Sequence, residues 1–309
     1  MTLIFRWNFI VLRNVVVVFL PDFNTALVYN LLHYWHLFGV WIGNKLKDMS
    51  STKKSIVFIT GAFVGNNCWD EWRLFFESKG YITLAPPWPN KDAGPEELRN
   101  RYPAADIASN RLTTLTEYYA GIVNGMEEKP ILIGHSIGGL IVQLLLQRGL
   151  GAAGIAIHSV PPQRIITFKF SFLKAGWGAL GFFTSTKKSY LISFKGWQYA
   201  FTNGMTCDEQ KESYYKFAIP ESKLVVRDTI SSAAKIDFKN PHAPLLLTSG
   251  STDHSIPASL NYANYKKYRK TNSVTDYKEF EGRNHFVLGQ PTWKEDAAYI
   301  LNWIEKNNI

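Results

Sequence analysis

One serine in this chain is flanked by glycines two positions away on either side. It is Ser136, in the sequence GHSIG at residues 134–138, between an apolar run at residues 131–133 that is typical of a strand and a longer one that is typical of a helix. A G-x-S-x-G sequence in that setting predicts a tight turn that raises the serine hydroxyl, with glycines where side chains would collide. We therefore predict that Ser136 is a nucleophile.

A serine hydroxyl attacks a carbonyl carbon only when a base takes its proton, so a histidine and an orienting acid are expected later in the chain. His285 lies just after the last predicted strand and before the last predicted helix, where such a base belongs. Asp253 follows the preceding strand and is the predicted acid, ahead of Asp237 and Asp276, whose surroundings are more typical of solvated residues. The predicted catalytic set is Ser136, Asp253 and His285.

The negative oxygen that forms when the hydroxyl attacks needs two backbone N–H donors. One is predicted to be the N–H of Ile137, directly after the nucleophile at the start of a helix. The other is predicted to be the N–H of Ala62, with Phe63 as a close alternative, in the loop after the first strand of the sheet. His135, inside the serine turn, is expected to support that turn and to lie beside the substrate.

These residues need a scaffold that brings several loops to one edge, and the rest of the sequence predicts one. A compact, β-branched apolar run predicts a buried strand at residues 55–60, and further strands are predicted at residues 81–85, 130–133, 153–158, 244–249 and 273–280. Helical spacing of apolar residues predicts helices at residues 69–78, 112–126, 137–148, 257–269 and 292–306, and the proline-rich residues 86–103 are expected to form a loop. The alternation predicts an α/β fold, with a mostly parallel sheet flanked by helices.

Residues 161–235 interrupt this alternation. They are rich in aromatic residues and lysine, and they predict a mainly helical cap or lid inserted before the penultimate strand. The α/β core then consists of residues 51–160 and 236–309. Trp177 of the insertion, together with Phe63 and Trp88 of the core, is predicted to line an apolar pocket for a hydrophobic substrate.

Positive charge is concentrated in the same insertion. The chain has a formal net charge of +9, and residues 161–235 hold 11 Lys and Arg against 5 Asp and Glu. A solvated basic face is the simplest interpretation, and attraction of anionic substrates or of a membrane surface is the alternative. The sequence contains no nucleic-acid, metal or nucleotide motif that we recognise. We therefore expect no metal, no cofactor and no nucleic-acid partner.

Residues 1–48 have a different composition from the rest of the chain. Residues 25–43 contain no Asp, Glu, Lys or Arg, over about the length that crosses a bilayer. Three interpretations stay open: a membrane anchor, an appended stretch ahead of a working start at Met49, or a helical extension packed on the body. The two cysteines form no C-x-x-C pair, which favours free thiols and a cytoplasmic location, with anchoring through residues 1–48 as the alternative.

The serine turn, the later acid and base, and the first strand ending in Thr60-Gly61 together resemble the α/β-hydrolase superfamily, in particular its capped esterases, lactonases and lipases. The resemblance covers roughly residues 51–308, and Thr60 stands where the family usually has histidine. It implies a carboxylic-ester hydrolase that cleaves a hydrophobic ester or a lactone through an acyl-enzyme, without a cofactor. Two alternatives remain: a non-hydrolytic enzyme of this fold (acyltransferase, lyase or perhydrolase) and a ligand-binding protein with low turnover.

Overall fold

The computed structural model describes residues 8–12, 15–19, 54–268 and 272–309. The chain divides into two units, Met1–Lys53 and Lys54–Ile309. In the first unit, β1 (Asn8–Leu12) pairs antiparallel with β2 (Val15–Phe19). Within the described ranges, no helix has both the length and the apolar character needed to cross a membrane. The predicted segment at residues 25–43 and the predicted start at Met49 lie outside the described residues.

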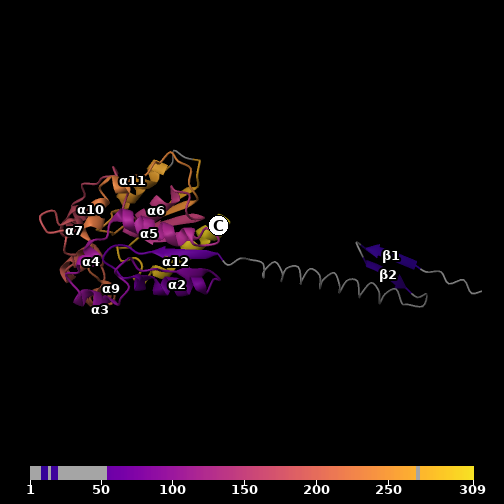
Figure 1. Ribbon diagram of the computed structural model, residues 1–309, viewed down its shortest axis with the longest axis horizontal. Helices are drawn as coiled ribbons and strands as arrows, with labels where there is room; N and C mark the ends of the chain where they lie inside the picture. The colour runs from indigo at the N-terminus through magenta and orange to yellow at the C-terminus, as the bar shows by residue number, and fades with distance from the viewer. Residues whose placement is uncertain (1–7, 13–14, 20–53, 269–271) are drawn as a thin grey trace, which may run out of the picture. The chain divides into compact units, whose positions relative to one another are not determined.

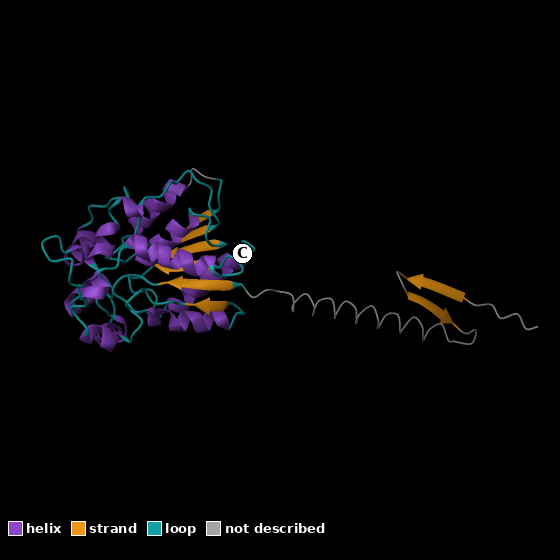
Figure 2. Cartoon of the chain, viewed as in Figure 1, coloured by secondary structure: helices purple, strands orange, loops and turns teal. Residues whose placement is uncertain are grey.

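The second unit is built on a six-stranded sheet in which every neighbouring pair of strands is parallel (Figure 2). All six predicted strands are present, with ends that differ by up to two residues from the prediction. They are β3 (Ser55–Ile59), β4 (Ile82–Leu84), β5 (Ile131–His135), β6 (Ala153–Ile157), β7 (Leu245–Gly250) and β8 (Thr275–Phe280), in the order β4-β3-β5-β6-β7-β8. The predicted fold class is confirmed.

Burial explains why the central strands have mostly apolar sequences without alternation. Every residue of β5, β6 and β7 is buried, whereas the edge strands β4 and β8 mix buried and exposed positions. A strand covered by helices on both faces cannot alternate between apolar and polar residues. The central strands therefore hold the loops at their carboxyl ends in fixed positions.

All five predicted helices are present in this unit (Figure 1). They are α2 (Asp70–Glu77), α5 (Leu112–Asn124), α6 (Ile137–Leu146), α11 (Ala258–Tyr268) and α12 (Trp293–Lys306). All ten residues of α6 are buried, because it packs on β5 and β6 and is itself covered by α5. Helices α2 and α12 meet through Trp72 and Trp293, whose ring centroids lie 5.9 Å apart.

The expectation of a simple loop at residues 86–103 is wrong. This stretch contains α3 (Pro95–Asn100), and α4 (Ala105–Ala108) follows it; a 3₁₀ turn, η1 (Asn66–Trp69), precedes α2. Pro95 occupies the first turn of α3 with Glu96 and Glu97, which is a favourable helix start. The prolines before and after this helix favoured the prediction of a loop.

Residues 161–235, which we call the helical segment, contain four helices and one 3₁₀ turn. These are α7 (Phe170–Leu180), α8 (Phe194–Ala200), α9 (Cys207–Phe217), α10 (Lys223–Asp228) and η2 (Ser232–Ala234). They lie in the chain between β6 and β7, which is where the insertion was predicted. Their role as a cap and the exact limits of the core stay predictions.

Candidate active site

Ser136 stands at a strained turn between β5 and α6. Its backbone has φ 56° and ψ −118°, a left-handed conformation that non-glycine residues seldom adopt. A Cβ added to Gly134 would lie 2.2 Å from the carbonyl oxygen of Gly138, and one added to Gly138 would lie 2.0 Å from that of Ile59. Only glycine fits at these two positions, because the turn presses the start of α6 against β3 and β5.

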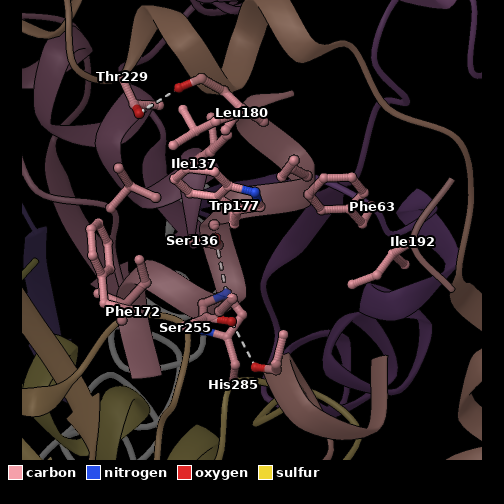
Figure 3. A pocket seen from close by; sticks show the side chains of 18 of the residues that line it. Phe63, Ser136, Ile137, Phe172, Trp177, Leu180, Ile192, Thr229, Ser255 and His285 are labelled. Carbon is pink, nitrogen blue, oxygen red and sulfur yellow. Dashed lines mark hydrogen bonds between the residues drawn. The ribbon is translucent and has the colours of Figure 1, made fainter. Parts of the chain in front are cut away.

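Three side chains from three loops form a continuous hydrogen-bonded relay at this turn. The Ser136 hydroxyl lies 3.0 Å from Nε2 of His285, and Nδ1 of His285 lies 2.8 Å from Oδ2 of Asp253. Asp253 follows β7 and His285 follows β8, so the parallel sheet delivers both to the edge where β5 ends. All three residues are buried, and Figure 3 shows the contact between Ser136 and His285.

The Asp253 carboxylate is held by donors on both of its oxygens. Oδ1 accepts the Ile256 N–H at 2.7 Å, and Oδ2 accepts Nδ1–H of both His285 and His158, the latter at 3.0 Å. Burial by itself would raise the pKa of Asp253, but His285 and His158 together bring it well below its ordinary value. Asp253 therefore remains ionised and keeps the proton of His285 on Nδ1.

His158 is a contact that sequence reasoning missed. The predicted strand at residues 153–158 ends at His158, and in the structure this side chain is completely buried against Asp253. Its backbone has φ 44°, and its Nε2 has no hydrogen-bond partner within the described residues. A Cβ on Gly250 would lie 2.7 Å from Cε1 of His158, so that glycine makes room for the ring. The available signal was position, because β6 ends beside β5 at the same edge.

His135 contacts the backbone of His285, the predicted base. Its Nε2–H donates to the carbonyl oxygen of His285 at 2.9 Å. Burial first, and then the neighbouring His285 and His158, lower the pKa of His135 well below its ordinary value, so the ring is neutral. His135 is not among the residues that line the cavity above Ser136, so the structure places it behind the base and away from the predicted substrate contact.

The two predicted oxyanion donors lie on the same side of Ser136. Ala62 and Ile137 both border the cavity, and within the described part of the chain neither N–H donates a hydrogen bond. Ile137 begins α6, where an N–H has no partner inside its helix. The alternative donor, the N–H of Phe63, is already taken by Oε2 of Glu221 at 3.1 Å.

A buried ion pair anchors the loop that carries Ala62. Glu221, from the helical segment, is completely buried and accepts both Nζ of Lys91 and the N–H of Phe63. Phe63 has φ 68°, and the same loop is bridged to the segment through Val64 and Ala218. This contact holds the Phe63 N–H turned away from Ser136. No sequence pattern predicts an ion pair between two residues that lie 130 positions apart.

Trp88 takes part in this anchor and not in the cavity. Its ring lies under Lys91, with Nζ 4.1 Å from the ring centroid, and its side chain is almost completely buried. It is not among the cavity-lining residues. The structure therefore separates Trp88 from Phe63 and Trp177, which do line the cavity.

A cavity of about 260 Å³ opens above Ser136 (Figure 3). Apart from Ser136 and His285, its lining is mainly apolar and comes largely from the helical segment. Two of its hydroxyl groups are already used, because Thr229 donates to the Val226 carbonyl and Ser255 to the Ala200 carbonyl. The cavity therefore offers apolar contact on most sides and a polar reacting group at its floor.

Among the described residues, His158, Asp253 and His285 form a group whose ligand-type atoms lie within 4.8 Å of one another. Such a set could hold a metal ion. Here both Nδ1 atoms are used as donors to Asp253, and a metal would have to replace those protons. The donor arrangement is that of a hydrogen-bonded relay.

Comparisons with known proteins agree with the fold. A family model described as "Alpha/beta hydrolase family" matches residues 56–295. No curated protein sequence gives a match.

Similar solved structures include a monoacylglycerol lipase from Paleococcus ferrophilus, with 19% sequence identity and a TM-score of 0.57, over 81% of this chain and 93% of that one. A pyrethroid hydrolase from Sphingobium faniae JZ-2 has 16% identity and a TM-score of 0.57, over 82% and 98%. A variant of tomato methylketone synthase I with bound beta-ketoheptanoate has 15% identity and a TM-score of 0.60, over 82% and 98%. At these identities the likeness concerns the fold.

Proposed function

The chain belongs to the alpha/beta hydrolase family, and we propose that it is a serine hydrolase that cleaves a hydrophobic carboxylic ester or a lactone. The observation that carries this proposal is the unbroken relay from Asp253 through His285 to Ser136, which opens onto an apolar cavity. A nucleophile, a base and an oriented acid in hydrogen-bond contact are the parts that acyl transfer requires.

In the first half of the reaction, Nε2 of His285 takes the Ser136 proton as Oγ attacks the substrate carbonyl carbon. The carbonyl oxygen gains the negative charge and accepts the N–H groups of Ala62 and Ile137. His285 then gives its proton to the leaving alkoxide, and the acyl group remains on Oγ. Asp253 stabilises the imidazolium that exists between these two transfers.

In the second half, His285 takes a proton from a water molecule whose oxygen attacks the acyl carbon. The same two N–H groups stabilise the second negative oxygen. The proton returns to Ser136 as the carboxylic acid leaves. For a lactone, the leaving oxygen stays attached to the acyl group, so one hydroxy acid is released.

The cavity supports a medium-sized hydrophobic substrate. Its volume of about 260 Å³ and its aromatic and aliphatic lining favour an acyl or aryl ester over a polar one. The names of two similar structures, a monoacylglycerol lipase and a pyrethroid hydrolase, are consistent with such a substrate. The helical segment supplies most of the lining, which is the role proposed for it as a cap.

The test combines active-site labelling with a substrate screen of the full chain. A fluorophosphonate probe should label Ser136, and p-nitrophenyl esters of increasing acyl length and a panel of lactones should identify the preferred class. A folded protein that is neither labelled nor active on any of them would contradict the proposal. Product analysis with a competing alcohol separates hydrolysis from acyl transfer.

A further inference from the structure

The helical segment exposes an unusual amount of apolar side chain around α7. Of the 15 large hydrophobic residues that are exposed in the described part of the chain, seven lie within residues 166–183. We call these seven the aromatic face: Ile166, Phe168, Phe170, Leu173, Trp177, Phe182 and Phe183. Single exposed apolar residues are ordinary, but a concentrated patch of this kind marks an interaction surface.

Helix α7 shows that the exposure is organised. Phe170, Leu173 and Trp177 are spaced by three and four residues, so they form one stripe along the helix, and they are 74%, 48% and 66% exposed. The only buried residue of α7 is Ala179. The stripe is therefore not packed into the core, and other described residues leave much of it exposed.

The charged residues in the stretch of chain that carries this face are all positive. Residues 161–207 contain six Lys and Arg and no Asp or Glu. All six are exposed and none forms an ion pair within the described residues; they are Arg164, Lys169, Lys174, Lys187, Lys188 and Lys195. Burial first, and then the positive charges of Arg227 and Lys188, lower the pKa of Lys223, as expected where positive charges are not neutralised.

The aromatic face borders the mouth of the cavity. Leu173, Trp177 and Phe182 are exposed and also line the cavity above Ser136. In Figure 3 the Trp177 ring lies above Ser136, with Phe172 to one side. Whatever covers this face therefore also meets the entrance to the reacting serine.

We propose that the aromatic face docks on a bilayer surface that carries anionic lipid. Aromatic side chains are favoured at the boundary between headgroups and acyl chains, and lysines next to them attract lipid phosphates. A second copy of the chain fits less well, because a symmetric contact would bring six unpaired positive charges against six others. Docking would turn the cavity mouth toward the acyl layer; that substrates enter from there rests on the proposed function, whereas docking itself does not.

The test measures co-sedimentation of the full chain with vesicles of phosphatidylcholine alone or mixed with phosphatidylglycerol. The apolar variant is Phe168→Ser/Phe170→Ser/Phe183→Ser, because these residues are exposed and do not line the cavity. We expect its partitioning to fall by about tenfold or more, with turnover of a soluble ester in the absence of vesicles unchanged. The charge variant Lys169→Gln/Lys187→Gln/Lys188→Gln should lose about fivefold per lysine on the anionic vesicles only.

Matched controls separate this surface from the rest of the chain. Leu74→Ser and Lys79→Gln change an exposed apolar residue and an exposed lysine on or next to α2, and they should bind vesicles as the unchanged chain does. Ser136→Ala should also bind normally, which makes docking independent of the reaction. Residues 1–48 are present in every variant and cannot create a difference between them.

Two results would overturn the proposal. One is equal vesicle binding by the apolar variant, the charge variant and the unchanged chain. The other is an unchanged chain that sediments as a dimer in solution and becomes a monomer in the apolar variant, with vesicle binding unaffected; the aromatic face would then be an interface between copies.

Discussion

The carboxyl edge of the sheet and the helical segment at residues 161–235 differ in how they treat polar and apolar groups. At the edge, Ser136, Asp253 and His285 are buried and joined to one another by hydrogen bonds. In the segment, Phe168 and Phe183 are 86% and 90% exposed, and lysines stand near them without ion pairs. A buried, hydrogen-bonded polar edge suits chemistry, and an exposed apolar surface suits recognition. Variants at the edge should therefore change kcat, and variants in the segment should change KM or binding.

The largest expected effect is that of Ser136→Ala. Without Oγ no acyl-enzyme forms, and kcat should fall by about four to six orders of magnitude, since the parts of a relay act as a unit. The check is ester turnover together with circular dichroism, which should show an unchanged fold. Turnover within tenfold of the unchanged chain would show that Ser136 is not the nucleophile.

Asp253→Asn should have the next largest effect. The amide cannot keep the proton on Nδ1 of His285, so kcat should fall by about 10³- to 10⁴-fold with little change in KM. Asp276→Asn is the matched control, because Oδ2 of Asp276 accepts the Trp303 indole N–H at 2.7 Å, away from the relay. If Asp276→Asn lowered kcat more than Asp253→Asn, the acid would be misassigned.

The features that could be predicted from the sequence are those that depend on neighbours along the chain. The central strands are short, mostly apolar runs and the serine turn is five consecutive residues, so both carry local signals. Asp253 and His285 could be located because loops after parallel strands must meet at one edge. That rule needs only the order of strands and helices.

The features that were missed depend on which distant segments pack together. Lys91 and Glu221 pair because the helical segment folds back against the loop after β4, and no sequence pattern marks that contact. Trp88 was predicted to line the cavity because it is aromatic, yet Lys91 lies over its ring. His158 was not predicted to take part in the site, although it ends a predicted strand that lies between β5 and β7, at the edge where Asp253 also lies.

Glu221 connects the two regions, because it belongs to the helical segment but holds a loop at the carboxyl edge of the sheet. The double variant Lys91→Met/Glu221→Leu removes both buried charges and the acceptor for the Phe63 N–H. We expect kcat to fall by about ten- to a hundredfold with KM nearly constant, because the loop that carries Ala62 loses its anchor.

The control for this change is Lys91→Met/Glu221→Gln, which also lacks the two charges but keeps an acceptor for Phe63. It should retain most of the activity, whereas a single Glu221→Leu would leave Lys91 buried without a partner and could unfold the protein. Equal kcat values for the two double variants would show that the anchor does not position the donor loop.

The free energy of unfolding should depend on pH because His135 is buried at the carboxyl edge of the sheet. The pKa of His135 is lowered in the folded protein, so between that pKa and about 6.5 the unfolded chain binds a proton that the folded chain does not. The free energy of unfolding should therefore fall as the pH drops below about 6.5, by up to about 1.4 kcal/mol per pH unit from this residue. The lowered pKa of Asp253 costs stability only below about 3.9.

His135→Gln isolates this contribution, because glutamine keeps an N–H donor and takes up no proton. Urea unfolding between about pH 6.5 and 4.5 should show a slope shallower by about one proton than that of the unchanged chain. Identical slopes would mean that His135 is protonated in the folded state.

The smallest expected effect is that of Trp177→Ala, measured in solution with a hydrophobic ester. Trp177 lines the cavity but is 66% exposed, so only part of its ring contributes to binding. We expect KM to rise by about threefold and kcat to stay constant, because an apolar wall binds substrate and transition state equally. Phe183→Ala, which removes an exposed ring outside the cavity, should change neither constant. A fall in kcat at constant KM for Trp177→Ala would place the segment in the chemistry, because only a group that stabilises the transition state selectively can have that effect.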